Sequence, residues 1–268
     1  MTIPLPAVHL TADPSASQPD GRLHSAQITR ADGRPQRNQP LLRKIEVACL
    51  DERGDIVDFT RLVPSHPVFD GAFSAVARGA LLQTERGAVA IEDVLPGDRI
   101  RTGGGDFETL LWKGSTLIHA QARGQSDAMR RLIRIPADTL GIARPMADLV
   151  LGPAARIVRS VPGIRRLTGG DHALMPARDF IDDLGFIELT PQVPVPVYHL
   201  AFARHERVAV NGLEVESFHP GPAHALGLSG ELEELLLSCF PHVSRLADFG
   251  ATLMPRLRRA DLDLIDVA

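Results

Sequence analysis

Alternating hydrophobic and polar positions run through the middle of this chain and predict strands there. The stretch 72–102 consists of short apolar runs separated by turn residues. Val89 and Ile91 stand two positions apart, which is the spacing of side chains on one face of a strand. The segment 95–98 (LPGD) combines the fixed φ of proline, the positive φ open to glycine and an aspartate that can bond its own backbone. We therefore interpret 72–102 as strand, turn, strand, turn, strand.

A second strongly patterned segment, 193–220, predicts a β-hairpin. Asn211-Gly212 lies between two alternating runs, which is the strongest short-range signal for a type I′ turn. A two-residue loop fixes the register of the two strands. The predicted cross-strand pairs are Val210 with Leu213, Val208 with Val215, and Arg207 with Glu216. The first two would face the core, and the third would form an opposite-charge pair on the other face.

Weaker patterns predict further strands on both sides of these segments. A lead-in hairpin is expected from 44–50 and 56–62, with a turn at Arg53-Gly54. Additional strands are expected at 107–118, 132–135, 148–151 and 155–158. The triplet 103–105 (GGG) has predicted strands on both sides, so it indicates a hairpin tip rather than a phosphate-binding loop before a helix.

The two ends of the chain differ from its β-rich middle. Residues 1–42 are rich in Pro, Ser, Asp, Gln and Arg, so we expect a disordered arm there. After Pro222 the apolar residues fall at helical spacing, with Ser229 as the N-cap: Leu232, Leu235, Leu236, Cys239 and Phe240. Pro255 is expected to open a second helix that runs through Leu264. The predicted divisions are an arm (1–42), a lead-in hairpin (43–70), a β domain (71–222) and a helical tail (223–268) that packs on the β domain or on a second subunit.

Composition excludes several classes of function. The net charge of -4 argues against a protein that binds nucleic acid through its phosphates. Cys49 and Cys239 are too few for a disulfide framework and are expected in the core, and nothing indicates a cofactor. No apolar run reaches the ~20 residues that span a bilayer, so no membrane contact is expected. The N-terminal sequence lacks the features of a secretory signal, which predicts a cytoplasmic protein, with export by a route that does not read the N-terminus left open.

Two sequence blocks resemble a known family. The first is 91–100 (IEDVLPGDRI), preceded by Gly79, Thr84 and Gly87. The second is 197–200 (VYHL), followed by His205, Val208, Asn211-Gly212 and Val215. Both resemble the Hint (hedgehog/intein) family in its bacterial form, over residues 72–222. The resemblance implies an all-β fold of hairpins, here with a short C-terminal helical tail.

The resemblance also assigns chemistry to particular positions. Hint domains process themselves: a first-residue Cys or Ser attacks the preceding carbonyl, and a Thr-x-x-His segment polarises the scissile peptide bond. An Asp in the VYDL strand assists, and inteins close on His-Asn. In this chain these positions hold Ala75, Gly152-Pro153-Ala154-Ala155, His199 and Glu216-Ser217. The family's reactive groups are therefore replaced, which implies a degenerate member that is not an enzyme but a scaffold or binding module.

Two alternatives stay open at this point. Ser74 could serve as the nucleophile of an N-to-O acyl shift, attacking the carbonyl of Phe73 with His205 or His199 as base. Alternatively, His199, His205, Glu206 and His219 could bind a metal ion, although their spacing matches no common ligand pattern. The predicted pairing places His205 opposite Phe218 and His219 opposite Arg204, so these two histidines would face different sides, and structural histidines are the favoured interpretation. The expected partner is an unidentified protein, or a second copy bound through the tail helix.

Overall fold

The computed structural model describes residues 41–266 of the chain. The chain divides into two units, Met1–Pro40 and Leu41–Ala268, of which the second is described below. The predicted disordered arm, apart from residues 41 and 42, lies outside the described residues.

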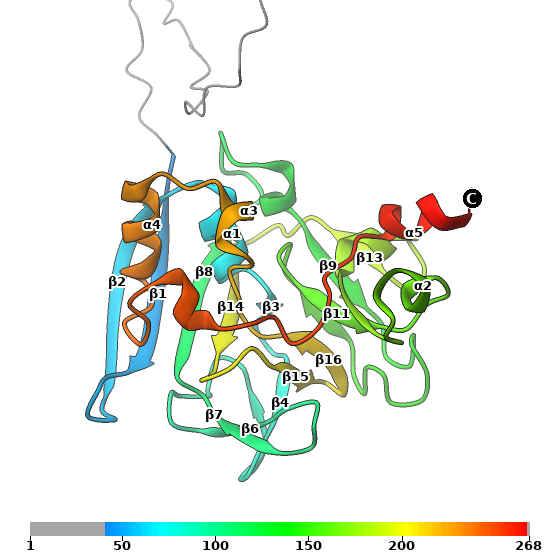
Figure 1. Cartoon of the computed structure of the whole chain (residues 1–268), viewed down its shortest axis with the longest axis horizontal. Coiled ribbons are helices and arrows are strands. Elements are labelled where there is room, and N and C mark those ends of the chain that lie inside the picture. Colours follow the sequence, from blue (N-terminus) through cyan, green and yellow to red (C-terminus); the bar gives the residue numbers. More distant parts are fainter. Residues whose placement is uncertain (1–40, 267–268) are drawn as a thin grey trace, which may run out of the picture. The chain divides into compact units, whose positions relative to one another are not determined.

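The regular structure of the described chain consists mainly of strands in two antiparallel sheets (Figure 1), as the sequence predicts. The first sheet has the order β13-β9-β10-β3-β14-β8-β1-β2. Its strands, in chain order, are β1 (Leu42–Leu50), β2 (Ile56–Pro64), β3 (Val76–Ala77), β8 (Trp112–Ile118), β9 (Leu132–Ile135), β10 (Leu149–Leu151), β13 (Ile187–Leu189) and β14 (Val195–Ala201).

The second sheet has the order β12-β11-β16-β15-β4-β6-β7, and β5 pairs with β4 beside this path. Its strands are β4 (Leu81–Thr84), β5 (Gly87–Ala90), β6 (Arg99–Arg101), β7 (Phe107–Thr109), β11 (Arg156–Arg159), β12 (Ala173–Pro176), β15 (Arg207–Val210) and β16 (Leu213–Glu216). The glycine triplet joins β6 to β7, so it is the tip of a hairpin, as predicted.

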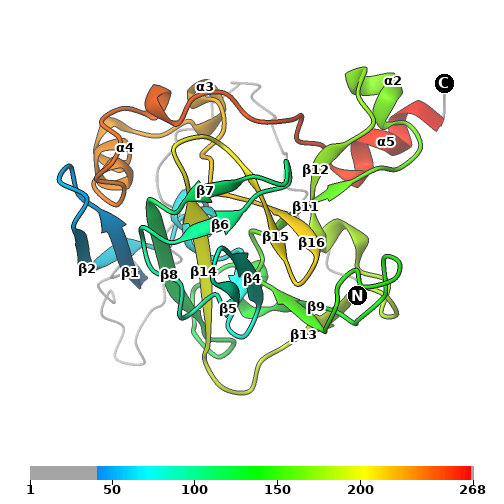
Figure 2. The ribbon, with the colours of Figure 1, turned by 90° about the horizontal axis from the view of Figure 1, so that it is seen from below.

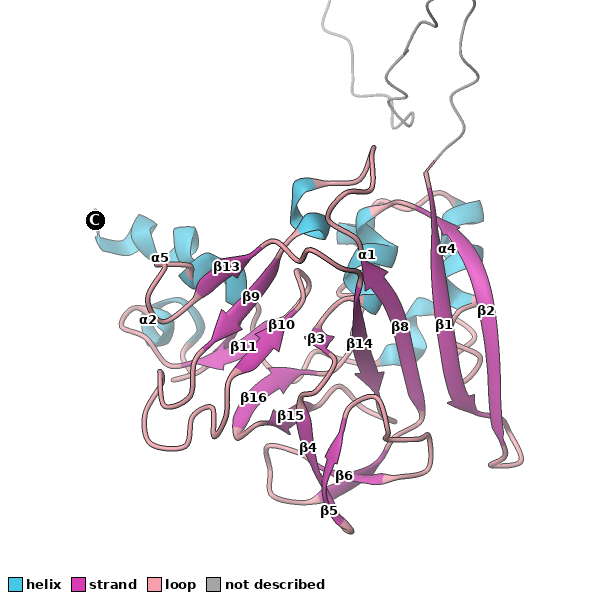
Figure 3. Ribbon diagram, turned by 180° about the vertical axis from the view of Figure 1, so that it is seen from behind, coloured by secondary structure: helices cyan, strands magenta, loops and turns pink. Residues whose placement is uncertain are grey.

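The lead-in hairpin continues the first sheet. β1 pairs with β2 along its whole length, and it also pairs with the central strand β8 over 45–49. Figure 3 shows the hairpin of β1 and β2 standing beside β8 and β14 at one end of this sheet.

The helices are short. They are α1 (Pro67–Phe73), α2 (Ile164–Thr168), α3 (Ala223–Leu226), α4 (Gly230–Leu237) and α5 (Arg259–Asp266), with 3₁₀ turns at Asp127–Arg130, Ala177–Phe180 and Leu246–Phe249. α4 confirms the predicted amphipathic helix, and the Ser229 hydroxyl accepts the Leu232 N–H at its N-terminus. No helix among residues 41–266 combines the length and the hydropathy needed to cross a membrane.

Two predictions about helices were wrong. The start of 72–102 is not a strand, because Ala72 and Phe73 are the last residues of α1. His66 is the N-cap of that helix, and Pro67 is its first residue. Pro255 does not open a helix. Leu174 N–H donates to the Pro255 carbonyl and Leu257 N–H donates to the Leu174 carbonyl, so 255–257 runs extended beside β12, and α5 begins only at Arg259.

One aromatic cluster joins the hairpin, the tail and the central strand β8. Trp112 of β8 stacks on Phe240 with ring centroids 4.4 Å apart, and its indole N–H donates to the Cys239 carbonyl at 2.7 Å. Phe73 from the end of α1 and Phe218 after β16 lie 5.4 and 6.0 Å from the Trp112 ring. The apolar stripe of α4 therefore packs on the β domain of its own chain (Figure 2).

Candidate functional site

The short strand β3 brings the family's nucleophile position into the middle of the first sheet. β3 pairs with β14 on one side and with β10 on the other. Just before it, the Ala75 N–H donates to the Tyr198 carbonyl at 3.1 Å, and the Ala75 carbonyl accepts the Gly152 N–H at 2.7 Å. Ala75 is fully buried among core side chains. The residue is thus held as a structural element of the sheet.

The Thr-x-x-His position lies directly against the same peptide bond. The Ala154 N–H donates to the Ser74 carbonyl at 3.0 Å, so the loop after β10 contacts the Ser74–Ala75 peptide through its backbone. A Cβ atom on Gly152 would stand 2.2 Å from the Ser74 carbonyl oxygen. Ala155 is buried and carries only a methyl group. The loop keeps its approach to the peptide bond but contributes neither a hydroxyl nor an imidazole.

Ser74, the alternative nucleophile, caps the end of α1. It is fully buried, and its hydroxyl donates to the Asp70 carbonyl at 2.5 Å, with Met129 Sδ 3.7 Å away. Within residues 41–266 no hydrogen bond joins this hydroxyl to His199 or His205. The structure therefore does not bring the proposed nucleophile and either proposed base together.

His199 occupies the position of the family's VYDL aspartate. Its Nδ1 lies 3.2 Å from the Gly71 carbonyl, which can only accept, so the neutral ring carries its proton on Nδ1. Nε2 is buried without a partner among the described residues, and the ring packs edge-on against Phe218. Burial lowers the pKa of His199 to about 4, so the ring is neutral at pH 7.

Glu216, at the position of the family's closing histidine, is the centre of a buried charge cluster. Its carboxylate contacts Arg256 Nε at 2.7 Å and Arg156 Nη1 at 3.2 Å. His205 Nε2 stands 3.1 Å from Glu216 Oε1 in a poorly aligned contact, while its Nδ1 accepts the Leu253 N–H. Burial alone would raise the pKa of the Glu216 carboxyl, but the His205 ring and the two guanidinium groups hold this pKa at about 2.

The structure corrects the predicted separation of the two histidines of this region. The rings of His205 and His219 lie 4.8 Å apart. The β15–β16 ladder ends at Arg207 and Glu216, after which the Phe218 N–H donates to the Leu200 carbonyl of β14. Beyond Ser217 the chain therefore no longer runs beside β15 but turns away from it. This turn places the rings of His205 and His219 on the same side.

Three of the four ring nitrogens of these two histidines are occupied by backbone groups. The Gly221 N–H donates to His219 Nδ1, and His219 Nε2 lies 3.1 Å from the Gly250 carbonyl. His205 is bonded through Nδ1 and paired with Glu216 through Nε2. Among the described residues no group of three or more His, Cys, Asp or Glu side chains is arranged to hold a metal ion.

The predicted pairing of Arg207 with Glu216 is right for the backbone and wrong for the side chains. All three predicted cross-strand pairs of the Asn211-Gly212 hairpin are present. Glu216 turns inward to Arg156 and Arg256, and Arg207 pairs instead with Glu214 at 3.4 Å. The two partly exposed guanidinium groups compete successfully because they reach the buried Glu216 carboxylate, where the attraction is stronger since water is excluded.

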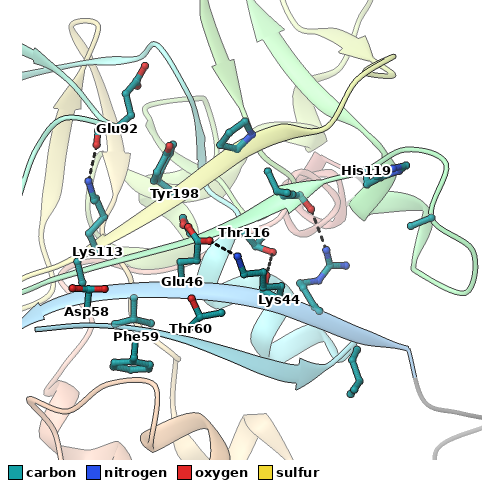
Figure 4. A pocket seen from close by; sticks show the side chains of 18 of the residues that line it. Lys44, Glu46, Asp58, Phe59, Thr60, Glu92, Lys113, Thr116, His119 and Tyr198 are labelled. Carbon is teal, nitrogen blue, oxygen red and sulfur yellow. Dashed lines mark hydrogen bonds and ion pairs between the residues drawn. The ribbon is translucent and has the colours of Figure 1, made fainter.

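A groove of about 790 Å³ lies on the other face of the first sheet, between β1, β2, β8 and β14 (Figure 4). Its charged and polar side chains include those of Lys44, Glu46, Thr60, Lys113, His119 and Tyr198. Lys113 Nζ is bonded to the Glu92 and Val94 carbonyls, and Lys44 is paired with Glu46, so these cations already have partners. Neighbouring residues of a strand face opposite sides of the sheet. Tyr198 therefore lines this groove, while His199 faces the opposite side, where the Hint positions described above lie.

A family model for the Hint domain matches residues 74–222, which is more than half of the chain. The chain belongs to the Hint domain family. The match begins at Ser74 and ends just after the Glu216 cluster, so it contains every Hint position described above. No curated protein matches the sequence. A solved structure of a splice-inactive, GSH-linked variant of the AceL NrdHF class 3 split intein is similar at 12% identity, with a TM-score of 0.36, over 54% of this chain and 97% of that one.

Sequence reasoning missed two members of the Hint site, Arg156 and Arg256. Arg156 follows the Thr-x-x-His position directly, but no motif marks it, and Arg256 lies 40 residues beyond Glu216. The available signal was Glu216 itself, since a carboxylate at the end of an apolar strand requires a cation when it is buried. Sequence reasoning missed α1 as well, although a residue that can cap before a proline, followed by an acidic first turn, indicates a helix start.

Proposed function

We propose that this Hint domain does not process itself and serves as a scaffold or binding module for an unidentified protein partner. The observation that carries the proposal is the Ser74–Ala75 peptide bond. Its N–H donates to Tyr198, its carbonyl accepts from Ala154, and the side chain that follows it is a methyl group. Such a peptide has the geometry of a sheet residue, and the residue on its C-terminal side carries no nucleophile.

The surroundings of this bond supply no proton-transfer group either. Acyl transfer needs a group that titrates near neutrality and reaches the reacting atoms. The one N–H of the neutral His199 ring donates to the Gly71 carbonyl, and the pKa of His199 is lowered to about 4. His205 is bonded to Leu253 and paired with Glu216. The Ser74 alternative lacks a base in contact with its hydroxyl, which points to the Asp70 carbonyl.

Packing on both sides of the Hint region supports a chain that stays whole. Phe73, immediately before the matched residues, and Phe240, after them, share one buried cluster with Trp112. This cluster also contains Ile45 and Val47 of β1 and Leu236 of α4. The segments on both sides of the Hint region are thus packed into the folded structure. The stripe of α4 is buried in this cluster, so we do not place the partner there.

Intact mass tests the proposal directly. The purified full-length protein is incubated with hydroxylamine and a thiol, which cut an ester or thioester, and its mass is compared with that of an untreated sample. We expect one species at 29.0 kDa in both samples. Fragments that begin at Ser74 or Ala75 would show an active self-processing domain and refute the proposal. Loss of that cleavage in Ser74→Ala would then identify Ser74 as the nucleophile.

A second test restores the family's residues one at a time. Ala75→Cys provides a thiol at the nucleophile position, and Ala75→Ser is the matched oxygen variant. We expect neither to cleave, because Gly152 and Ala155 still provide no polarising group. Efficient cleavage by Ala75→Cys alone would mean that the remaining site is intact and that only the nucleophile has been lost.

A further inference from the structure

The two sheets end in strands of very different length. Three of the four end strands have three or four residues: β13, β7 and β12. β12 is in addition covered by 255–257, through hydrogen bonds at Leu174. The fourth, β2, has nine residues and lies at the outer end of the first sheet (Figure 3). Proteins normally shorten, cover or interrupt the edges of their sheets, because a long exposed edge is a template for another strand.

The outward edge of β2 can be identified from the register with β1. The Asp51 N–H donates to the Asp55 carbonyl and the Ser65 N–H donates to the Leu41 carbonyl. Hydrogen-bonded pairs alternate along an antiparallel ladder, so the odd-numbered residues of β2 direct their N–H and C=O groups toward β1. The backbone groups of Ile56, Asp58, Thr60 and Leu62 point away from it. Within residues 41–266 no hydrogen bond to these outward groups is found outside the β1–β2 ladder.

The side chains along this edge are exposed and largely apolar. Ile56 is 49% exposed, Leu62 is 59% exposed and Val57 is 37% exposed. β2 contains no lysine, and its proline is its last residue, two positions beyond Leu62, so the central part of the edge has every N–H available. The protection that β2 does carry is limited to the charges of Asp58 and Arg61 and to Pro64 at its end, while its length and its apolar residues leave the centre of the edge open.

The sequence of β2 is complementary to itself in one antiparallel register. With Thr60 facing Thr60 of a second copy, Asp58 faces Leu62 and Phe59 faces Arg61. All outward N–H and C=O groups from Asp58 to Leu62 then meet outward groups of the other strand. No like charges are directly opposed. Arg61 already lies over the Phe59 ring of its own strand at 5.4 Å, and the second Arg61 would approach the same ring from across the ladder.

We propose that the partner of β2 is a second copy of this chain, paired antiparallel about a two-fold axis at Thr60. The interface is isologous, so the dimer is closed and does not extend into a fibre. The first sheet of each copy continues into that of the other. The inference is independent of whether the Hint site is active, because β2 lies outside residues 74–222.

Light scattering with size exclusion tests the dimer on the full-length protein. At about 100 μM, a dimer with a Kd of about 1 μM is almost fully populated. We expect twice the chain mass of 29.0 kDa. A monomer mass at this concentration would overturn the proposal. It would do so even if the edge of β2 binds a different protein.

Charge variants at the two-fold axis test the register. Thr60→Lys and Thr60→Asp each place two like charges opposite one another, so each variant alone should be a monomer. An equimolar mixture should recover the dimer, because lysine then faces aspartate. The matched control is Glu46→Lys, a charge change at an exposed position of β1, one strand inside the edge, and this variant should remain dimeric. The proposed register would be refuted if each Thr60 variant forms a dimer on its own. It would also be refuted if mixing the two variants does not restore the dimer.

Thr60→Pro examines the hydrogen bonds of the same edge. Its N–H points outward, so proline removes an intermolecular donor and no donor of the β1–β2 ladder. We expect a folded monomer with the far-UV circular dichroism spectrum of Thr60→Ala, while Thr60→Ala stays dimeric. If Thr60→Pro is a folded dimer, the copies do not pair through this edge.

Discussion

At the scale of single residues, the most constrained side chain is that of Glu216. Its side chain is 2% exposed and it contacts Arg156, Arg256 and His205. A buried carboxylate is tolerated only when its charge is compensated by such partners. Glu216 therefore acts as an electrostatic support that ties β16 to β11 and to the C-terminal segment.

The depressed pKa of Glu216 predicts how stability depends on pH. The folded-state pKa of about 2 lies below the unfolded value of 4.5, so this stabilisation is present above pH 4.5 and is lost as the pH falls toward 2. The difference corresponds to about 3 kcal/mol in the free energy of unfolding. Chemical unfolding of Glu216→Gln between pH 2 and pH 7 should show a lower stability at pH 7 and a flatter profile below pH 4.5.

The control for this experiment is Glu214→Gln on the same strand. Glu214 is half-buried and pairs with Arg207, and such pairs contribute about 0.5 kcal/mol. Its pH profile should follow that of the unchanged protein. An unaltered acid profile in Glu216→Gln would show that another group, such as His199, dominates acid unfolding.

At the scale of elements, the segment that follows α4 is held in place mainly by aromatic packing. Phe240 stacks on both Trp112 and Phe218, at 4.4 and 4.6 Å, and Trp112 is the only tryptophan of the chain. The indole is fully buried. Fluorescence therefore reports on this contact without a label.

Removing the Phe240 ring should loosen the tail. Phe240→Ala is expected to lower the free energy of unfolding by about 3–5 kcal/mol and to shift the Trp112 emission to longer wavelength, because water reaches the indole. Leu237→Ala, a substitution of a partly buried residue at the end of α4, should leave the emission unchanged. Unchanged emission in Phe240→Ala would contradict the assignment of this contact.

Local elements were predictable from the sequence where neighbouring residues determine them. Asn211 takes a φ of 47° in the predicted turn, and the register of its hairpin follows from the loop length. The two sequence blocks that resemble the Hint family lie within the residues that the family model matches. The partners of Glu216 could not, because Arg156 and Arg256 reach it from elements 60 and 40 residues away, and a sequence pattern does not specify such contacts.

At the scale of the whole described unit, the Hint region and its flanks share one of the hydrophobic clusters. β1 pairs with β8 from Ile45 to Cys49, and these residues pack on α4 and Trp112. Stability of this kind does not depend on an unbroken chain. It depends on the buried apolar area and on the ladder between the strands.

A cut between the hairpin and α1 tests this statement. A protease site inserted next to Ser65 and cut after purification should leave the β1–β2 hairpin bound to the rest of the protein. The fragments should elute together in native buffer and separate in denaturant. Release of the hairpin in native buffer would show that the covalent link, and not the shared core, holds it.

The close contact at Gly152 has a consequence for the history of this chain. A threonine there would force its Cβ to within 2.2 Å of the Ser74 carbonyl oxygen, so the backbone would have to move before the side chain could be accepted. Ala75→Cys without that threonine confers no chemistry, and the threonine without a backbone shift costs stability. Neither step is favoured alone, so the proposed function implies that a lineage with this structure does not reach self-processing by single substitutions.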